Sequence, residues 1–337
     1  MHRLHVKYLT GWVRKNTRGL LLIVTVGIIA ELISNLNSRL SSPVVALVIG
    51  FCLVNFGFVK EWAKPSLDLA AGRILKIGIC LLGFRLAFSE ITEIGSPIGI
   101  IVVIAVVIIV FFGIQKISAA FSVNKSLSLL VASGFSICGV SAIAAMKPLS
   151  GADEEETGYA VGLVTLFGSI AVFVFPIVHE IFQLDENLFG WWIGLSVHDT
   201  GQVVAAASAV SENTLDSAVL VKMCRILMLA PLLMFVSITQ QNREKIKRKW
   251  SLPIPFFIVG FIAAATIRST SFFSDELIQN IGQVRNFLIT VAMFGLGSGV
   301  RIRGLKKLGR QPMTLGFVSW IAVLIVTGAG VLIQNQI

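Results

Sequence analysis

Four uncharged apolar runs constrain this chain more than any other feature of its sequence. Each is about long enough to cross a hydrocarbon core of roughly 30 Å as a helix. The runs are Pro43 to Val59, Pro97 to Ile114, Thr157 to Val178 and Pro312 to Gln334. Transmembrane β-barrels show short alternating segments instead, so these runs predict membrane-spanning helices.

The composition supports the same class of protein. Of 337 residues, 55% are hydrophobic and 14% are charged, and the mean hydropathy is +0.86, outside the usual range of soluble domains. Weaker apolar segments fill the gaps: Gly19 to Leu36, Leu69 to Phe88, Ser126 to Met146, Leu188 to Val210, Asp216 to Ile238, Leu252 to Ile267, and Asn286 to Val300. We therefore predict an all-α integral membrane protein with ten or eleven transmembrane helices. No linker is long enough to separate soluble domains, so residues 1–337 are expected to form one polytopic membrane domain.

The distribution of lysine and arginine predicts the orientation. With eleven spans and a cytoplasmic N-terminus, the cytoplasmic side receives the basic segment 1–18 and the clusters at 243–249 and 301–310. The outside receives only Arg39, Lys147, Arg268 and Arg285, together with the acidic loop 151–156. Lys and Arg favour the cytoplasmic side, so we predict a multi-pass inner-membrane protein with its C-terminus outside. The net charge of +10 then needs no nucleic-acid partner.

Two internal similarities stand out. Segments 43–114 and 253–334 share the pairs Gly50-Phe51 and Gly260-Phe261, each seven residues after a proline, and an offset of seven spans predicts inverted repeats. The second similarity joins GFSICGVSAIAA, from residue 134, to GLSVHDTGQVVAA, from residue 194. In an eleven-span topology these two segments run in the same direction. Either the likeness is accidental, or one segment is re-entrant and the count of spans is wrong.

Ionisable side chains inside spans mark the candidate site. Each costs about 2.5 to 3.5 kcal/mol on insertion scales, so such groups are usually paired or functional. Arg85, His198, Asp199, Lys222 and Arg225 are the deepest. Lys222 and Arg225 are three residues apart on one helix face and repel each other unless an anion, or a carboxylate such as Asp199, lies between them.

Glycine-rich stretches predict where helices break. Gly134, Ser136, Gly139 and Ser141 lie in the middle of one predicted span, and Gly295, Gly297 and Gly299 lie in another. Glycine weakens a helix by about 1 kcal/mol relative to alanine, and the free N–H groups of a broken helix bind anions. Ordinary close contacts between membrane helices are the alternative explanation.

A catalytic function is one alternative for the same residues. Ser136 or Cys138 with His198 is a conceivable nucleophile and base of an intramembrane hydrolase, although Gly-x-Ser alone is a weak motif. Cys52, Cys80, Cys138 and Cys224 all fall in predicted spans and show no disulfide or metal-ligand spacing, so no cofactor or metal is expected. No Walker pattern is present, so an ion gradient is the expected energy source.

Four motifs together resemble one family. LLGFRLAFSEI (81–91), SICG (136–139), SVHDTGQVVAA (196–206) and KMCRILMLAP (222–231) are similar to the YeiH-like bacterial inner-membrane proteins, whose label as sulfate exporters is itself an inference. The resemblance covers nearly the whole chain. It extends distantly to cation/proton antiporters and bile-acid symporters, which implies two broken helices crossing at the membrane centre, at SICG and at the glycine-rich span ten. Asp199 stands where relatives commonly have glutamate, so a carboxylate is kept on a side chain one methylene shorter.

These observations lead to a secondary transporter, and not an enzyme, as the expected function. The substrate is a small inorganic or sulfonate anion such as sulfate, bound by Arg85, Ser136, Cys138, Gly139, Lys222 and Arg225. His198, Asp199 and Gln202 are the predicted proton-coupling or gating groups, because histidine changes charge near physiological pH. The coupling ion is a proton or sodium, and a homo-oligomer is left open. A monovalent cation/proton antiporter that uses Asp199 is the main alternative.

Overall fold

Helices make up the regular structure of every described part of the chain. The computed structural model describes residues 2–36, 41–85, 97–239, 256–270, 273–299 and 310–335, and no strand occurs among them. The basic clusters at 243–249 and 301–309, Arg39 and the last part of the 81–91 motif lie outside the described residues. Five described helical stretches are long and apolar enough to span a membrane: Lys15–Leu36, Pro97–Ala120, Glu154–Phe182, Glu212–Thr239 and Pro312–Gln334. The chain is therefore an all-helical, multi-pass membrane protein.

Internal packing divides the chain into two units, each described here by itself. Unit 1 comprises Met1–Ala87 and Gly260–Ile302, and unit 2 comprises Phe88–Val259 and Arg303–Ile337. The boundary at 259 and 260 falls inside an apolar helix. For this reason no polar linker revealed the division in the sequence.

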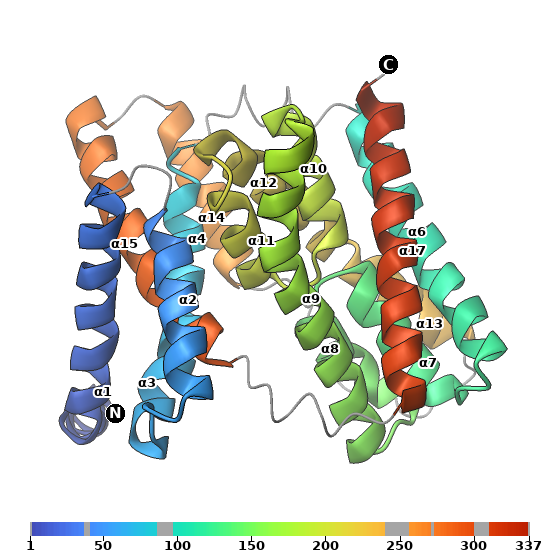
Figure 1. Ribbon diagram of the computed structural model, residues 1–337, viewed down its shortest axis with the longest axis horizontal. Coiled ribbons are helices and arrows are strands. Elements are labelled where there is room, and N and C mark those ends of the chain that lie inside the picture. The colour runs from blue at the N-terminus through green and yellow to red at the C-terminus, as the bar shows by residue number, and fades with distance from the viewer. Residues whose placement is uncertain are drawn as a thin grey trace. The chain divides into compact units, whose positions relative to one another are not determined.

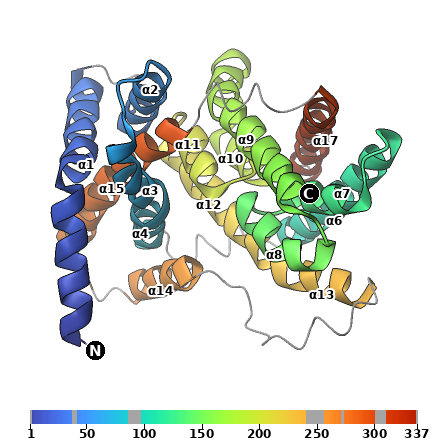
Figure 2. The ribbon, with the colours of Figure 1, turned by 90° about the horizontal axis from the view of Figure 1, so that it is seen from below.

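Unit 1 is built around one long helix. Its elements are α1 (His2–Leu36), α2 (Ser42–Asn55), η1 (Glu61–Ala63), α3 (Lys64–Leu69), η2 (Ala70–Ile74), α4 (Leu75–Leu82), most of α14 (Phe256–Ser269), and α15 (Asp275–Gly299). The helix α15 packs against α1, α2, α3 and α4 (Figure 2). The first helix starts at His2, so the basic segment predicted to precede it is part of α1.

The glycines of α15 serve helix packing. A Cβ on Gly297 would lie 2.9 Å from the carbonyl carbon of Leu47, and one on Gly295 would lie 2.7 Å from the carbonyl oxygen of Leu67. The helix continues without a break to Gly299. The prediction of a second broken helix at Gly295 to Gly299 is therefore wrong, because these glycines allow backbones to approach closely.

Unit 2 contains long helices and two hairpins of short ones. Its elements are α6 (Pro97–Ala120), α7 (Lys125–Ser136), α8 (Val140–Ser150), α9 (Glu154–Phe182), α10 (Glu186–Ser196), α11 (Thr200–Ser208), α12 (Glu212–Leu227), α13 (Leu229–Thr239) and α17 (Arg310–Asn335). In Figure 1, α9 runs the height of this unit, with α7 and α8 toward its lower end and α10 and α11 toward its upper end.

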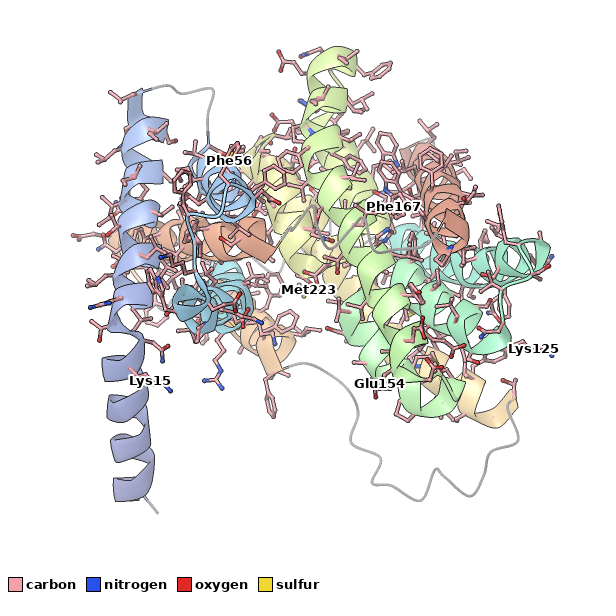
Figure 3. All side chains as sticks on the ribbon, turned by 60° about the horizontal axis from the view of Figure 1, so that its bottom comes forward. Lys15, Phe56, Lys125, Glu154, Phe167 and Met223 are labelled. Atoms are coloured by element: carbon pink, nitrogen blue, oxygen red, sulfur yellow. The ribbon has the colours of Figure 1, made fainter. Side chains whose placement is uncertain are left out.

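The first hairpin consists of α7, the interruption Ile137–Gly139, and α8. The Asn124 side chain, which caps the start of α7, donates to the Glu156 carboxylate in the first turn of α9. Lys147, near the end of α8, pairs with Glu154. Both ends of the hairpin therefore lie at the start of α9, and Figure 3 shows Lys125 and Glu154 toward the same end of the unit.

The second hairpin consists of α10, the interruption Val197–Asp199, and α11. Asn213 and Thr214 in the first turn of α12 donate to Glu186 at the start of α10, over 3.1 and 3.2 Å. Since α11 ends four residues before α12 begins, both ends of this hairpin lie together, next to the end of α9. A helix of 29 residues rises about 43 Å, so the two hairpins open at opposite ends of α9.

The two hairpins correct the predicted topology. Segments 126–146 and 188–210 were expected to cross the membrane, but each returns to the end from which it started. Each has the total apolar length of a span, divided between two helices too short to cross. Two of the predicted crossings, 126–146 and 188–210, are therefore hairpins in the part of the chain that the structure describes. The likeness between residues 134–145 and 194–206 reflects two hairpin tips.

Candidate functional site at the hairpin tips

Lys222 lies where the two hairpin tips meet. Its side chain is fully buried in the middle of α12. The Nζ ammonium donates to the carbonyl oxygen of Ile137 over 2.7 Å and to that of Val197 over 2.8 Å. One acceptor belongs to each interruption, so a single cation joins the two hairpins.

Arg225 extends this arrangement one helical turn further along α12. Its guanidinium, 1% exposed, donates to the carbonyl oxygens of Phe135 (2.8 Å) and Ser136 (3.1 Å) at the end of α7. It also donates to three carbonyl oxygens in and after the last turn of α10, those of Gly194 (3.0 Å), Leu195 and Val197 (3.3 Å). The guanidinium therefore bonds both hairpins.

The reason for two buried cations lies in the backbone. The last four carbonyl groups of a helix have no partner within the helix, and its C-terminus carries a partial negative charge. Here α7 and α10 end at the same place, so two sets of unpaired carbonyls would face each other in a buried region. Lys222 and Arg225 supply the donors and the opposite charge. Neither forms an ion pair with a carboxylate among the described residues, so carbonyl dipoles take the place predicted for Asp199.

Two glycines bring α10 close enough for this arrangement. A Cβ on Gly190 would lie 2.7 Å from the Thr214 carbonyl oxygen, and one on Gly194 would lie 2.6 Å from the Ala218 carbonyl oxygen. The backbones of α10 and α12 are therefore in direct contact. Sequence reasoning missed this pair, although Gly190-x-x-x-Gly194 fits the small-residue spacing of membrane helix contacts.

The start of α8 is open. Its N-cap residue is Gly139, with φ of 64° and ψ of −126°, and no side chain caps the helix. Val140 is 39% exposed, and Ser141 is also exposed. The first N–H groups of a helix lack internal partners and lie at its positive end. This helix start can therefore accept an anion.

The start of α11 is closed by the chain itself. The Asp199 carboxylate accepts from the Gly201 N–H over 2.8 Å, and the Gln202 side chain accepts from the Asp199 N–H over 3.3 Å. The Gln202 amide also donates to the Thr165 carbonyl oxygen of α9 over 3.1 Å and fills the space beside Gly168. Asp199 is only half-buried. The two helix starts lie close together, since a Cβ on Gly139 would be 3.6 Å from the Asp199 nitrogen.

Three further predicted site residues line the inside of the tips. His198 is fully buried, its ring lies 4.2 Å from that of Phe135 between centroids, and neither ring nitrogen has a hydrogen-bond partner in the described part of the chain. The Ser136 hydroxyl is buried and donates to the Ser133 carbonyl oxygen over 3.4 Å. Cys138 is 3% exposed. The structure thus brings eight of the nine predicted residues to the hairpin tips.

Arg85 is the ninth and belongs to unit 1. It follows the last turn of α4 and lines a cavity with Arg268 and Arg285. Its predicted role beside Lys222 and Arg225 remains a prediction. Sequence reasoning missed the cavity because its other two arginines had been assigned to the orientation of the chain.

The fold and these contacts define a class: multi-pass helical membrane proteins with two opposed hairpins joined by buried cations. Comparison with known proteins gives the family. A family model described as "Conserved hypothetical protein 698" matches residues 18–316. The chain belongs to this family, whose members are the UPF0324 membrane proteins, YeiH among them.

Relatives match over most of their length. A UPF0324 membrane protein of Corynebacterium glutamicum is 35% identical over 97% of this chain and 95% of its own. The UPF0324 inner membrane protein YeiH of Escherichia coli is 31% identical over 84% of this chain and 83% of its own. A UPF0324 membrane protein of Pasteurella multocida is 31% identical over 90% and 92%. No solved structure matches the chain.

Proposed function

We propose that this protein is a secondary transporter of a small anion, with sulfate or a sulfonate as substrate, bound at the hairpin tips. The observation that carries this proposal is the uncapped, exposed start of α8 at the meeting point of two opposed hairpins. Discontinuous helices in the middle of a membrane domain are a recurrent way to build a transport site. Each hairpin is followed by a long helix, α9 after α8 and α12 after α11, and these two helices start at opposite ends of the unit. This order supports an inverted repeat within unit 2, which is a different pair of segments from the predicted repeat of 43–114 and 253–334.

The contrast between the two helix starts supports an anionic substrate. Asp199 fills the start of α11 with a carboxylate of the chain, whereas Gly139 leaves the start of α8 without one. A bound anion would give the start of α8 the negative charge that the Asp199 carboxylate gives the start of α11. The backbone N–H groups of Val140 and Ser141 and the Ser141 hydroxyl are the donors within reach of such a ligand.

Lys222 and Arg225 have a supporting part in this proposal. Most of their N–H groups are already donated to backbone carbonyls, so they hold the tips together and add positive potential without direct contact with the substrate. The same contacts weigh against the cation/proton antiporter. The carbonyl groups that a sodium ion would require are occupied by a lysine and an arginine.

His198 and Asp199 are the proposed coupling groups. Asp199 is half-buried beside the open start of α8, so a proton on its carboxylate changes the charge next to the substrate. His198 lies one residue away and is fully buried. We infer a proton as the coupling ion and an inner-membrane location.

The hairpins keep the inferred orientation of the termini. With nine crossings the N-terminus remains cytoplasmic and the C-terminus remains outside. The loop 151–156 and Lys147 move to the cytoplasmic side, which leaves Arg39, Arg268 and Arg285 as the basic residues of the outer loops and helix ends. With Lys147 on the cytoplasmic side, the distribution of lysine and arginine agrees better with the rule that these residues favour the cytoplasm.

The hydrolase alternative lacks support from the contacts. The Ser136 hydroxyl donates to Ser133, and His198 has no hydrogen-bond partner among the described residues, so the two do not form a nucleophile–base pair.

Transport in proteoliposomes tests the function. We expect uptake of radiolabelled sulfate, or of taurine-like sulfonates, that rises with an imposed proton gradient. Val140→Pro removes one N–H donor while keeping a residue that suits the first helical position, and it should raise the KM for the anion about tenfold. Val140→Ala, which keeps the N–H, is the matched control. Equal KM values for the two variants would place the anion elsewhere.

The coupling role needs a variant that preserves the fold. Asn retains the capping oxygen that Gly201 requires, so Asp199→Asn should leave the unfolding temperature unchanged. It should abolish stimulation by the proton gradient while anion exchange at equal pH persists. A pH-dependent response to sodium with none to sulfate would instead support the cation antiporter.

A further inference from the structure

The connection between α2 and α3 in unit 1 exposes three aromatic side chains. Phe56, Phe58 and Trp62 are 75%, 73% and 47% exposed. Figure 1 shows the end of α2 and the start of α3 at the lower end of this unit, where α1 begins. Scattered exposed apolar side chains are common, whereas several close together indicate a surface that contacts a partner or a membrane.

Backbone hydrogen bonds hold the first part of this connection in place. The Phe56 N–H donates to the Cys52 carbonyl oxygen, and the Phe58 N–H donates to the Leu53 carbonyl oxygen, each over 2.9 Å. Gly57 between them has φ of 81°, a left-handed conformation that glycine adopts without strain. The turn therefore presents both phenylalanines outward by its own geometry.

The helix before this turn is short for a membrane span. With 14 residues α2 rises about 21 Å, whereas the hydrocarbon core is roughly 30 Å thick. Residues 56–59, Phe-Gly-Phe-Val, continue the apolar run that begins at Pro43. The turn thus extends the apolar surface of α2 toward the end of the span, where lipid acyl chains can cover its phenylalanines.

Basic side chains flank the aromatic ones. Lys60 directly precedes η1 and Lys64 directly follows it, and both are exposed. The exposed carboxylates of η1 and α3 are Glu61 and Asp68. Orientation rules account for lysines on the cytoplasmic side of a span, but they do not account for exposed phenylalanines in the same connection.

The first helix adds two more cations. Lys15 and Arg18 are exposed on α1, which packs against η1 and α3. A Cβ on Gly19 would lie 3.6 Å from the Ala63 Cα and 2.9 Å from the Ser66 Cβ. The two cations precede this contact by one turn and by one residue, so they lie at the same end of unit 1 as the lysines beside η1. Four cations therefore surround the three aromatic side chains.

We propose that an anionic phospholipid binds this basic–aromatic surface, which comprises the three aromatic residues and the four cations around them. The ammonium and guanidinium groups donate to the phosphodiester of the headgroup, and the acyl chains cover the phenylalanines. In the orientation inferred above the surface faces the cytoplasmic leaflet, whose anionic lipids attract basic residues next to a span. The site lies within unit 1 and is independent of the transported substrate.

Native mass spectrometry of the full-length protein in detergent tests the site, with dioleoyl phosphatidylglycerol and dioleoyl phosphatidylcholine as probes. We expect the wild type to retain the anionic lipid about tenfold more tightly than the zwitterionic one. The double variant Lys60→Gln, Lys64→Gln should lose most of this preference. The matched control is Lys116→Gln, Lys125→Gln, which removes two exposed cations from unit 2 and should keep the preference.

The same measurement separates the lipid from other sources of phosphate. Glycerol 1-phosphate carries a similar headgroup without acyl chains, so it should not displace the lipid at equal concentration. Displacement by glycerol 1-phosphate would overturn the lipid as the ligand. Equal loss of preference in the two double variants, or no preference in the wild type, would overturn the site.

A second measurement locates the aromatic turn in a bilayer. A spin label on Phe58→Cys, in vesicles of phosphatidylcholine and phosphatidylglycerol, should be relaxed more strongly by oxygen, which enters the bilayer, than by a water-soluble nickel chelate. A label on Glu155→Cys, at the exposed start of α9, should show the opposite order, and the native cysteines are not exposed. Stronger relaxation of the Phe58→Cys label by the nickel chelate would place the turn in water and overturn the proposal.

Discussion

At the scale of single residues, Lys222 and Arg225 show how buried charge is compensated without a carboxylate. Seven hydrogen bonds connect the two side chains to backbone carbonyls of α7, α10 and the interruptions that follow them. An isolated charge in the hydrocarbon region is costly, and so is an unpaired carbonyl. Bringing the two together removes both costs.

Replacing Lys222 tests this account. In Lys222→Met the Val197 carbonyl keeps a bond from Arg225, whereas the Ile137 carbonyl loses the only side-chain donor that it has among the described residues. We expect the free energy of unfolding to fall by roughly 1–3 kcal/mol, the usual cost of one unsatisfied buried group. Thermal unfolding in detergent measures the effect. Lys116→Met, at an exposed position of α6, is the control, and an equal loss in both variants would contradict the account.

At the scale of elements, the contact between α10 and α12 determines where the second hairpin lies. Gly194 sits directly against the Ala218 carbonyl oxygen and the Val221 side chain. The close approach also brings the Gly194 carbonyl oxygen to Arg225. The glycine therefore serves both packing and the polar contacts of the tip.

A methyl group at this position should separate the two helices. In Gly194→Ala the added Cβ would lie 2.6 Å from the Ala218 carbonyl oxygen, so we expect a loss of roughly 1–3 kcal/mol in stability and a loss of transport. Gly158→Ala in α9 is the matched control, because no atom lies within 4 Å of its added Cβ. That variant should be as stable as the wild type or slightly more stable. Equal unfolding temperatures for the two variants would exclude a tight contact at Gly194.

The long apolar helices were predictable, and the hairpins were not. The predicted spans at 97–114, 157–178 and 312–334 correspond to α6, α9 and α17, because an uncharged run of this length has few alternatives. Segment 126–146 has the same apolar length, and hydropathy does not report that the chain reverses at Gly139. The likeness of residues 134–145 to 194–206 was the only indication. The glycines at 295–299 led to a wrong prediction of a broken helix, because glycine is common both where helices break and where two helices pack closely.

Part of the candidate site was predictable for a similar reason. Charged residues in an apolar stretch are conspicuous, so Lys222, Arg225 and Asp199 were identified from the sequence. Their partners were not identified, because every residue has a backbone carbonyl group and the sequence does not show which of these groups accept hydrogen bonds from Lys222 and Arg225. The cavity of unit 1 was not predicted, because Arg268 and Arg285 had been assigned to the orientation of the chain and Arg85 lies far from both along the sequence.

At the scale of the whole molecule, the topology proposed above predicts on which side of the membrane each end of α9 lies. Glu155 at the start of α9 should face the cytoplasm, and Leu184 after its end should face outside. Single cysteines at these exposed positions can be labelled with an impermeant maleimide in right-side-out vesicles, with the unsubstituted protein as background. We expect Leu184→Cys to react in intact vesicles and Glu155→Cys to react only after permeabilisation. The reverse pattern would show that the protein has the opposite orientation in the membrane. Labelling of both cysteines in intact vesicles would show that α9 does not cross the membrane.

The bonds of Lys222 and Arg225 also limit how unit 2 can change shape. They fasten α12 to the ends of α7 and α10, three stretches that lie far apart along the chain. If one hairpin moved by itself, the hydrogen bonds between its carbonyl groups and the buried cations would break. Both groups would then be buried and unpaired, with no water to replace the lost bond. If the protein exposes a ligand alternately to the two sides, as the proposed function requires, the change costs less free energy when both tips move together with α12 as one body.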